Sequence, residues 1–269
     1  MKIFKSFNVL NSEINFNENI GFVPTMGSLH KGHIYLIKKA KFKLRKVLVS
    51  IFVNPTQFNE KKDFNRYPRK INKDISILRK LGVDYVFIPK NKEIYNKGIR
   101  RKIKILKKDK ILCAKHRIGH FEGVLAVINR LLENIDAKFM FLGEKDFQQI
   151  FLIKKYLQKK FKTKIIVCKT IRNTNKLPLS SRNVLLDKNS LKKSEKISKI
   201  LFSYKKRVIN KFSDIKLLKS YLSKIKLLCD KVEYFEIRNS KNLSKKFTKI
   251  NFKIFIAYKQ GNVRLIDNF

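Results

Sequence analysis

The sequence is poor in cysteine, proline, glycine and tryptophan. Tryptophan is absent, and the 269 residues include 3 cysteines, 5 prolines and 9 glycines. The cysteines, Cys113, Cys168 and Cys229, are odd in number and far apart, and no C-x-x-C pattern occurs. This usage argues against a disulfide framework and favours a reducing compartment in which the thiols are buried or incidental.

Long apolar runs are also missing. No segment approaches the roughly 20 apolar residues that a membrane span requires. The first residues, Met1–Phe16, contain no unbroken apolar core of signal-peptide length. We therefore expect a soluble, cytoplasmic protein without a membrane partner.

Acidic residues are scarce as well. The 64 Lys and Arg outnumber the 20 Asp and Glu, which gives a formal net charge of +44. Taken alone, this excess suggests nucleic acid or an anionic surface as a partner. The lysines, however, are spread along the whole chain. We interpret them as solvated residues that reflect compositional drift, and we do not expect nucleic acid as a partner; a steep salt dependence of binding would contradict this.

The pattern of apolar residues predicts an α/β fold. With 43% hydrophobic residues, the chain can bury a sizeable core in one or two domains. Apolar runs alternate with amphipathic helical stretches in the first part, which indicates a Rossmann-like parallel sheet with crossover helices. The predicted strands there are residues 21–24, 47–53, 83–88, 138–142 and 165–168, and the basic segment 100–106 is a candidate for a strand with an exposed face.

The pattern changes after about Asp187. Lys-rich helical stretches at residues 190–211 and 213–228 precede three strand-like runs at 232–238, 253–258 and 263–267. The turn Gln260–Asn262 predicts a hairpin between the last two runs. We place a domain boundary near residue 180, with a smaller C-terminal α/β domain following.

The most informative stretch is a strand–loop–helix junction at residues 21–33. An apolar run ends at Pro24, Gly27 and Gly32 follow, and apolar residues then recur at helical spacing. Such a junction directs unpaired backbone N–H groups and the positive end of a helix dipole outward, which suits phosphate. His30 and His33 share one face if the first helical turn includes them, and they can donate to anionic oxygens.

Two other interpretations of this junction are a metal site and an ordinary connection. Zinc-binding helices place their histidines four apart with a Glu between them, whereas here the spacing is three with Lys31 between, so a metal site is disfavoured. An ordinary strand-to-helix connection is the other alternative. All 4 histidines, however, lie in two short glycine-containing stretches, which core filling does not explain: His30, His33, His116 and His120.

Three further segments follow predicted strands or open predicted helices, where ligands of parallel sheets bind. Residues 117–123 form a second glycine and histidine loop. Residues 143–149 carry three consecutive charges, for which a solvated turn or an Asp146 N-cap is an alternative. Residues 179–183 offer two hydroxyls and a guanidinium to phosphate oxygens, and a helix cap with a surface arginine stays open as the alternative.

Seven segments, in order along nearly the whole chain, resemble the pantothenate synthetase (pantoate–β-alanine ligase) family of the HxGH nucleotidylyltransferase superfamily. They are residues 23–33, 51–58, 67–69, 119–124, 143–149, 179–183 and 264–268. The resemblance implies a homodimer that uses ATP and Mg²⁺. It also implies that pantoate attacks the α-phosphate of ATP to give pantoyl adenylate and pyrophosphate, and that β-alanine then displaces AMP. Residues 1–180 would form the nucleotide-binding catalytic domain and residues 181–269 a lid.

The resemblance also assigns roles to residues. His30, His33, Lys145 and Arg182 would be catalytic, with His33 as the family's proton donor and Lys145 facing the α-phosphate. Gln57 and Gln149 would bind pantoate, with Gln57 also close to β-alanine, and Asp74 is a candidate for the Mg²⁺ neighbourhood. The residues assigned to ATP are Met26, Gly27, Ser28, Leu29, His30, Lys31, Gly32, His33, Gly143, Glu144, Lys145, Asp146, Ile171, Leu179, Ser180, Ser181 and Arg182.

The sequence departs from the family pattern in three places. Ile118 replaces a proline, Cys113–Ala114 replaces an acidic–glycine pair, and Asn175–Lys176 replaces Asp–Gly before the Ser-Ser-Arg motif. We expect the loss of that glycine to stiffen or reshape the lid. Two other functions stay open: a transferase that adenylates another small acid or nucleotide, from which Gln57 and Gln149 discriminate, and a non-catalytic basic binding protein.

Overall fold

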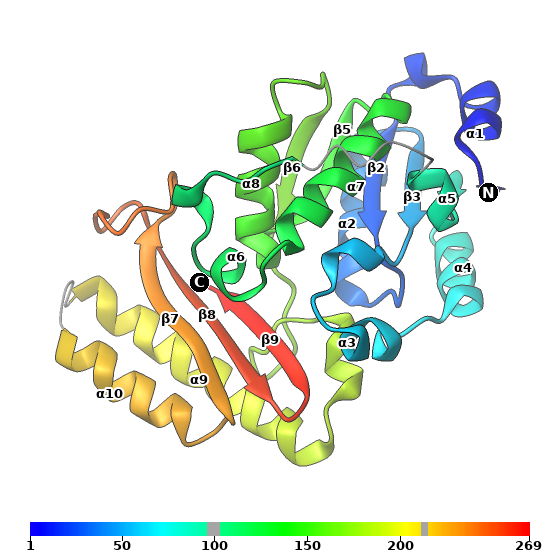
Figure 1. Cartoon of the computed structure of the whole chain (residues 1–269). Coiled ribbons are helices and arrows are strands. Elements are labelled where there is room, and N and C mark those ends of the chain that lie inside the picture. The colour runs from blue at the N-terminus through cyan, green and yellow to red at the C-terminus, as the bar shows by residue number, and fades with distance from the viewer. Residues whose placement is uncertain (96–102, 211–214) are drawn as a thin grey trace. The chain divides into compact units, whose positions relative to one another are not determined.

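The computed structural model describes residues 1–95, 103–210 and 215–269 (Figure 1). The chain divides into two compact units, Met1–Lys169 and Thr170–Phe269. The first contains a parallel sheet with crossover helices, and the second contains helices and a small antiparallel sheet. The predicted fold class is therefore confirmed.

The first unit is organised around a six-stranded parallel sheet in the order β1-β4-β3-β2-β5-β6. Strand β3 is buried along its whole length, as its nearly continuous apolar run predicts. Strand β2 lies between β3 and β5, so the order of the strands reverses there. The strands are β1 Lys2–Phe4, β2 Gly21–Thr25, β3 Val47–Ile51, β4 Tyr85–Phe87, β5 Phe139–Gly143 and β6 Lys164–Cys168.

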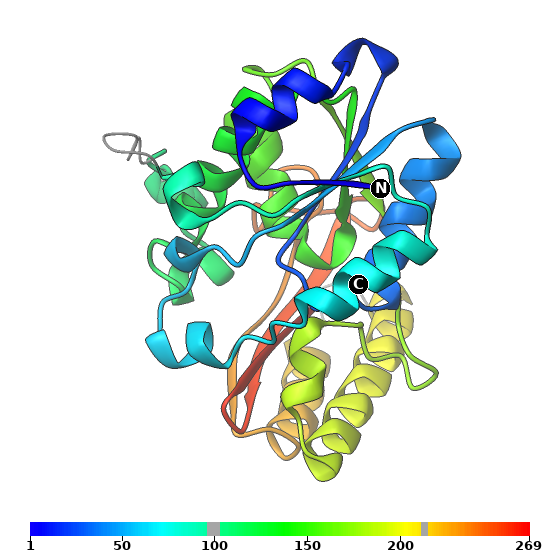
Figure 2. The same cartoon turned by 90° about the vertical axis from the view of Figure 1, so that its right-hand side faces the viewer.

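Helices cover both faces of this sheet. Figures 1 and 2 show α2 (Lys31–Lys43) and α4 (Ile71–Lys80) on one face, and α7 (His120–Asn134) and α8 (Phe147–Leu157) on the other. This division follows from right-handed crossovers that run in opposite directions from β2. The apolar stripe of α2 buries Leu36, Ile37 and Ala40 against the sheet.

Short elements link these helices and strands. The α-helices among them are α1 Phe7–Glu13, α3 Lys61–Arg66, α5 Asn91–Ile94 and α6 Cys113–His116. The 3-10 helices of the chain are Phe16–Glu18, Pro55–Gln57, Lys107–Asp109, Glu144–Asp146 and Ser181–Leu185.

The strand suggested at 100–106 is not found at 103–106, and residues 100–102 lie outside the described residues. Burial does alternate here, with Ile105 buried between exposed Lys104 and Leu106, but the backbone N–H of Leu106 donates to the Tyr156 hydroxyl at 2.8 Å and not to a neighbouring strand.

The second unit packs two helices on a three-stranded antiparallel sheet in the order β7-β8-β9. The three predicted strand runs are confirmed, and Gly261 forms the hairpin turn with a φ of 58°. Of the predicted helix ends, Lys211 and Ser213 lie outside the described residues. The elements are α9 Lys188–Asn210, α10 Ile215–Lys226, β7 Lys231–Asn239, β8 Phe252–Gln260 and β9 Val263–Asn268.

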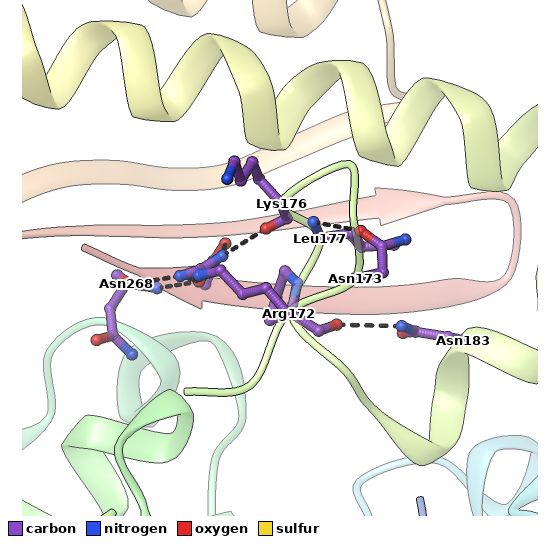
Figure 3. A network of polar contacts seen from close by, with 8 residues as sticks. Arg172, Asn173, Lys176, Leu177, Asn183 and Asn268 are labelled. Carbon is purple, nitrogen blue, oxygen red and sulfur yellow. Dashed lines mark hydrogen bonds and ion pairs between the residues drawn. The ribbon is translucent and has the colours of Figure 1, made fainter. Parts of the chain in front are cut away.

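The division between the units precedes the predicted boundary near residue 180. The loop after β6 belongs to the second unit because its polar side chains bind there. The Arg172 guanidinium pairs with both carboxylate oxygens of Asp267 at 2.7 Å (Figure 3). Asn173 and Asn175 donate to Glu195 at 2.6 and 2.9 Å. Within the described ranges, no helix is long and apolar enough to cross a membrane.

Candidate active site

The glycine and histidine loop lies where the strand order reverses. It follows β2, and the segment 143–149 follows the neighbouring strand β5. The crevice between the carboxyl ends of two such strands is the usual ligand site of an open parallel sheet. The fold therefore places two of the predicted segments at the edge of the sheet where ligands of open parallel sheets usually bind.

His30 and His33 build the start of α2. His30 is the N-cap, and its Nδ1 accepts a hydrogen bond from the backbone N–H of Gly32 at 3.0 Å. The Nδ1 of His33 in turn accepts from the backbone N–H of His30 at 3.4 Å. Since both Nδ1 atoms are acceptors, each neutral ring carries its proton on Nε2, and both rings act as donors through that atom.

Gly32 is required by this arrangement. A β-carbon at this position would lie 2.7 Å from Cε1 of His30 and 2.9 Å from its Nδ1. The imidazole of the N-cap therefore occupies the space that any other side chain would need. In the H-x-G-H pattern the two histidines therefore supply the N–H donors, and the glycine leaves room for the ring of the N-cap histidine.

Lys145 lies close enough to both histidines to change their protonation. Burial and then the Lys145 charge lower the pKa of His30 to about 4. Burial, His30 and Lys145 lower the pKa of His33 well below its usual value. The Lys145 ammonium also pairs with the Asp146 carboxylate at 3.1 Å. The site therefore combines two neutral imidazole donors with one ammonium.

Asp74 fastens the loop that precedes α2. Its carboxylate, on α4, is buried and accepts the backbone N–H groups of Ser28 and Leu29 at 2.7 and 2.8 Å. Sequence reasoning considered Asp74 only as a neighbour of Mg²⁺. In the structure each of its oxygens already binds a backbone group, which suits a positioning role better than a dedicated metal ligand.

A pocket of about 550 Å³ opens beside this loop, at the carboxyl ends of β2, β3 and β4. Its apolar wall includes Met26 and Phe52, and its polar wall includes Asp74. Three basic residues, Arg69, Lys70 and Lys90, line it as well. A cationic pocket of this size suits a small anionic molecule.

Gln57 is held by the second glycine and histidine loop. The Gln57 backbone carbonyl accepts from Arg117 at 3.0 Å and contacts His120 Nδ1 at 2.6 Å. Gly123 comes so close that a β-carbon there would lie 2.4 Å from the carbonyl oxygen of Thr56. The loop at the end of the predicted segment 51–58 and the loop 117–123 therefore form one packed assembly, in which Gln57 itself is buried.

The segment 143–149 forms a 3-10 turn and then α8. Asp146 occupies the N-cap position of α8 but makes no side-chain cap hydrogen bond there. Gln148 is buried and donates to the carbonyl of Ile111 at 2.7 Å, whereas Gln149 is only partly buried. Gln149 therefore stays a predicted pantoate ligand.

The second unit carries the other predicted nucleotide residues. The backbone N–H of Leu179 donates to the carbonyl of Ile171 at 2.9 Å. Ser180 caps the following 3-10 helix by accepting from the backbone N–H of Arg182, and Ser181 is buried. The cap interpretation of this segment is therefore confirmed for Ser180, and the roles of Ile171, Leu179, Ser180, Ser181 and Arg182 toward ATP stay predictions.

The loop between Ile171 and Leu179 keeps a glycine-like turn without glycine. Lys176 has a φ of 72°, in the left-handed region that favours glycine. The Arg172 guanidinium donates to its carbonyl at 2.9 Å, and the Asn173 side chain accepts the next backbone N–H, that of Leu177, at 2.9 Å (Figure 3). Local hydrogen bonds thus hold the shape that glycine would adopt easily.

Sequence reasoning missed two polar side chains beside Gln57. Asn54 is buried and donates to the Gln57 side chain at 3.2 Å, and Tyr95 donates to Asn54 at 2.5 Å. Asn54 lies in the segment 51–58 that resembles the family, so the sequence does contain a signal for this residue. Tyr95 lies at the end of the four-residue helix α5, where no periodic pattern marks it.

These features together define an α/β protein with paired histidines and a lysine at the switch point of a parallel sheet. Comparison with known proteins gives the family. The family described as pantoate-beta-alanine ligase matches residues 2–269. The chain therefore belongs to the pantoate–β-alanine ligase family, whose members join pantoate to β-alanine with ATP, and it is an enzyme of this kind.

Individual relatives are similar to this chain along nearly its whole length. A protein named pantothenate synthetase from Francisella tularensis subsp. tularensis is 42% identical over 270 residues, covering 98% of this chain and 94% of the relative. The crystal structure of the pantoate-beta-alanine ligase from Francisella tularensis, complexed with beta-gamma ATP and beta-alanine, is 41% identical with a TM-score of 0.86 and covers 100% and 97%. The pantothenate synthetase structure from Thermus thermophilus is 29% identical with a TM-score of 0.92, covering 100% and 99%.

Proposed function

We propose that this enzyme forms pantoyl adenylate at the switch point of its parallel sheet and then transfers the pantoyl group to β-alanine. The observation that carries this proposal is the position of His30 and His33, whose rings lie 4.1 Å apart at the start of α2 after β2, with Lys145 directly after the neighbouring strand β5. A reaction at phosphorus needs positioning and charge stabilisation more than covalent help. Two N–H donors and one ammonium supply these.

In the first step a pantoate carboxylate oxygen bonds to the α-phosphorus of ATP, and the bond from that phosphorus to the bridging oxygen breaks. Pyrophosphate leaves with the bond electrons. Lys145 stabilises the charge on the α-phosphate, and the Nε2–H groups of His30 and His33 bind phosphate oxygens. In the second step the β-alanine nitrogen bonds to the acyl carbon, AMP leaves, and the nitrogen loses a proton.

The remaining residues bind the substrates. Gln57 and Gln149 hydrogen-bond pantoate and leave its carboxylate able to attack. In the first unit, residues 26–33 and 143–146 bind ATP. In the second unit, Ile171 and residues 179–182 are assigned to ATP on the family resemblance, with Arg182 as a further phosphate ligand.

Mg²⁺ would be held mainly by the ATP phosphates. In the described part of the chain, no group of three or more His, Cys, Asp or Glu side chains could hold a metal ion. Mg²⁺ commonly keeps several waters and binds through substrate phosphates with one or two carboxylates. The chain fits this mode without a dedicated carboxylate ligand, since both oxygens of Asp74, the residue suggested for the Mg²⁺ neighbourhood, already bind backbone N–H groups. Bound Mg²⁺ would neutralise charge on the leaving pyrophosphate.

The family resemblance also supports a homodimer in the cytoplasm. Sedimentation of the purified protein tests the dimer: a single species at twice the chain mass of 31.9 kDa is expected. A monomer that is fully active would contradict this part of the proposal.

Pyrophosphate exchange into ATP tests the chemistry. Exchange that requires pantoate, and that occurs without β-alanine, is the expected result because the adenylate forms before the amine reacts. Exchange that ignores pantoate would indicate another acid as the substrate. Absence of exchange, with the protein folded and ATP and Mg²⁺ present, would contradict the adenylate route.

A further inference from the structure

The Gln57 side chain stands at the end of a chain of hydrogen bonds that begins outside the predicted site. Tyr95 donates to the Asn54 side-chain oxygen at 2.5 Å, and Asn54 donates to the Gln57 side-chain oxygen at 3.2 Å. Asn54 and Gln57 are both buried. The relay joins α5, the loop after β3 and the 3-10 helix Pro55–Gln57 within one compact unit.

The direction of the Asn54 amide is set by backbone groups. Its Oδ1 faces the backbone N–H of Thr56 at 3.2 Å, which can only donate. Its Nδ2 faces the backbone carbonyl of Gly123 at 3.1 Å, which can only accept. Exchanging the two atoms would oppose donor to donor and acceptor to acceptor, so one orientation satisfies the amide.

The orientation of Asn54 determines that of Gln57. Since Asn54 presents an N–H to Gln57, the Gln57 atom that faces it is the oxygen, and the Gln57 nitrogen faces the other way. That nitrogen contacts the sulfur of Met26, a residue of the pocket wall. A thioether is a weak acceptor, so a substrate oxygen can replace it at little cost. Gln57 therefore meets a ligand as a donor.

Tyr95 completes the relay. Its hydroxyl is the shortest contact of Asn54 Oδ1, and the hydroxyl of Thr56 joins the same oxygen at 2.9 Å. The Tyr95 ring packs near Phe52, with ring centroids 6.4 Å apart, which fixes the place of the hydroxyl. Burial raises the pKa of Tyr95, so the hydroxyl keeps its proton and stays a donor at neutral pH.

We infer that Tyr95 is a positioning residue: it holds Asn54 in the orientation that the backbone groups select, so that the N–H groups of the Gln57 amide face an acceptor oxygen of the bound hydroxy acid. This rests on the proposed role of Gln57 in binding pantoate. It adds a specificity rule: Gln57 serves a carboxylate or hydroxyl oxygen and does not accept a hydrogen bond from the β-alanine ammonium.

The test is a double-mutant cycle on the KM for pantoate. Tyr95→Phe keeps the ring and removes the hydroxyl, and we expect it to raise this KM about fivefold to tenfold, the loss of one hydrogen bond. The KM values for ATP and β-alanine should stay within about twofold. In the Gln57→Ala background the same substitution should have no further effect on the KM for pantoate, because the group that Tyr95 orients is gone.

Controls separate this inference from a general loss of structure. Tyr156→Phe removes a hydroxyl that donates to Asp109 at 2.5 Å, in the same unit but outside the relay, and it should leave the KM for pantoate unchanged. Thermal unfolding of each variant reports whether it folds. An equal effect of Tyr95→Phe with and without Gln57 would overturn the inference, as would an unchanged KM for pantoate in Tyr95→Phe.

The same data test the proposed function independently. If Gln57→Ala leaves the KM for pantoate unchanged, the assignment of Gln57 to pantoate is wrong and the inference falls with it. If Gln57→Ala raises that KM while Tyr95→Phe does not, the assignment stands and only the positioning role of Tyr95 is rejected.

Discussion

The imidazole rings of His30 and His33 lie against each other with their centroids 4.1 Å apart. Both rings bind backbone N–H groups through Nδ1, so the cap and the proposed phosphate site are made from the same two side chains. A protonated ring carries a proton on Nδ1, so this atom could no longer accept the backbone N–H group. The neutral state of both histidines is therefore part of the fold at this site.

Acid should destabilise the protein through these histidines. The pKa of His30 in the folded protein is about 4, below the value of about 6.5 in an unfolded chain. The unfolded state therefore binds more protons as the pH falls below about 6.5, and the free energy of unfolding decreases down to about pH 4. The free energy of unfolding, measured in urea, should decrease between pH 7 and pH 5 in both proteins. The decrease in His30→Asn should be smaller than that of the parent protein by on the order of 1 kcal/mol. Equal losses in both proteins would contradict the neutral state.

Replacing Lys145 tests the charge at the proposed reaction centre. Lys145→Met keeps the length of the side chain and removes the ammonium, and we expect kcat to fall by about 10²–10³ because transition-state charge loses a partner. The pKa of His30, followed by NMR, should rise in this variant because the Lys145 charge lowers it.

The control for Lys145 is Lys160→Met, which removes a surface ion pair with Glu133. This variant should retain its full kcat, since exposed pairs contribute little. Near-normal turnover of Lys145→Met would refute the assigned role.

Asp74→Asn separates fastening of the loop from metal binding. The amide has one acceptor oxygen, so either Ser28 or Leu29 loses its backbone hydrogen bond. We expect the free energy of unfolding to fall by about 1–2 kcal/mol and the KM for ATP to rise. The Mg²⁺ concentration for half-maximal rate should stay the same, whereas a metal ligand would shift it strongly. Exposed Asp136→Asn is the matched control.

Lys176→Gly should stabilise the protein. A φ of 72° strains a residue with a β-carbon by about 1–2 kcal/mol. Glycine relieves this strain, but it also gives the unfolded chain more conformational entropy, which offsets part of the gain. We expect a net gain of about 0.5–1 kcal/mol in chemical denaturation. Lys110→Gly, at an exposed residue whose φ is −79°, should instead lower stability. A destabilised Lys176→Gly would mean that the lysine side chain contributes more than its backbone costs.

Much of the fold was predictable because the strands of the parallel sheet are continuous apolar runs and the long helices have one apolar stripe. Strand β1 was missed because its three residues are too few to show a pattern. The division between the compact units, after Lys169, depends on contacts such as that of Arg172 with Asp267, which are 95 positions apart in sequence, and no local signal reports such a pair.

The candidate site was predictable where chemistry and spacing coincide in one segment, as in H-x-G-H. It was not predictable where a side chain acts across segments. Tyr95 follows a helix of four residues, and Asp74 sits on an amphipathic helix where a carboxylate normally faces solvent. Only the folded chain shows that both turn inward, toward Asn54 and toward the loop before α2.

The contact between Gly123 and Thr56 has a mechanical consequence. With no side chain separating the two backbones, α7 and the Pro55–Gln57 turn cannot shift independently without opening a gap between them. Any displacement of that helix is therefore transmitted to the amide of Gln57.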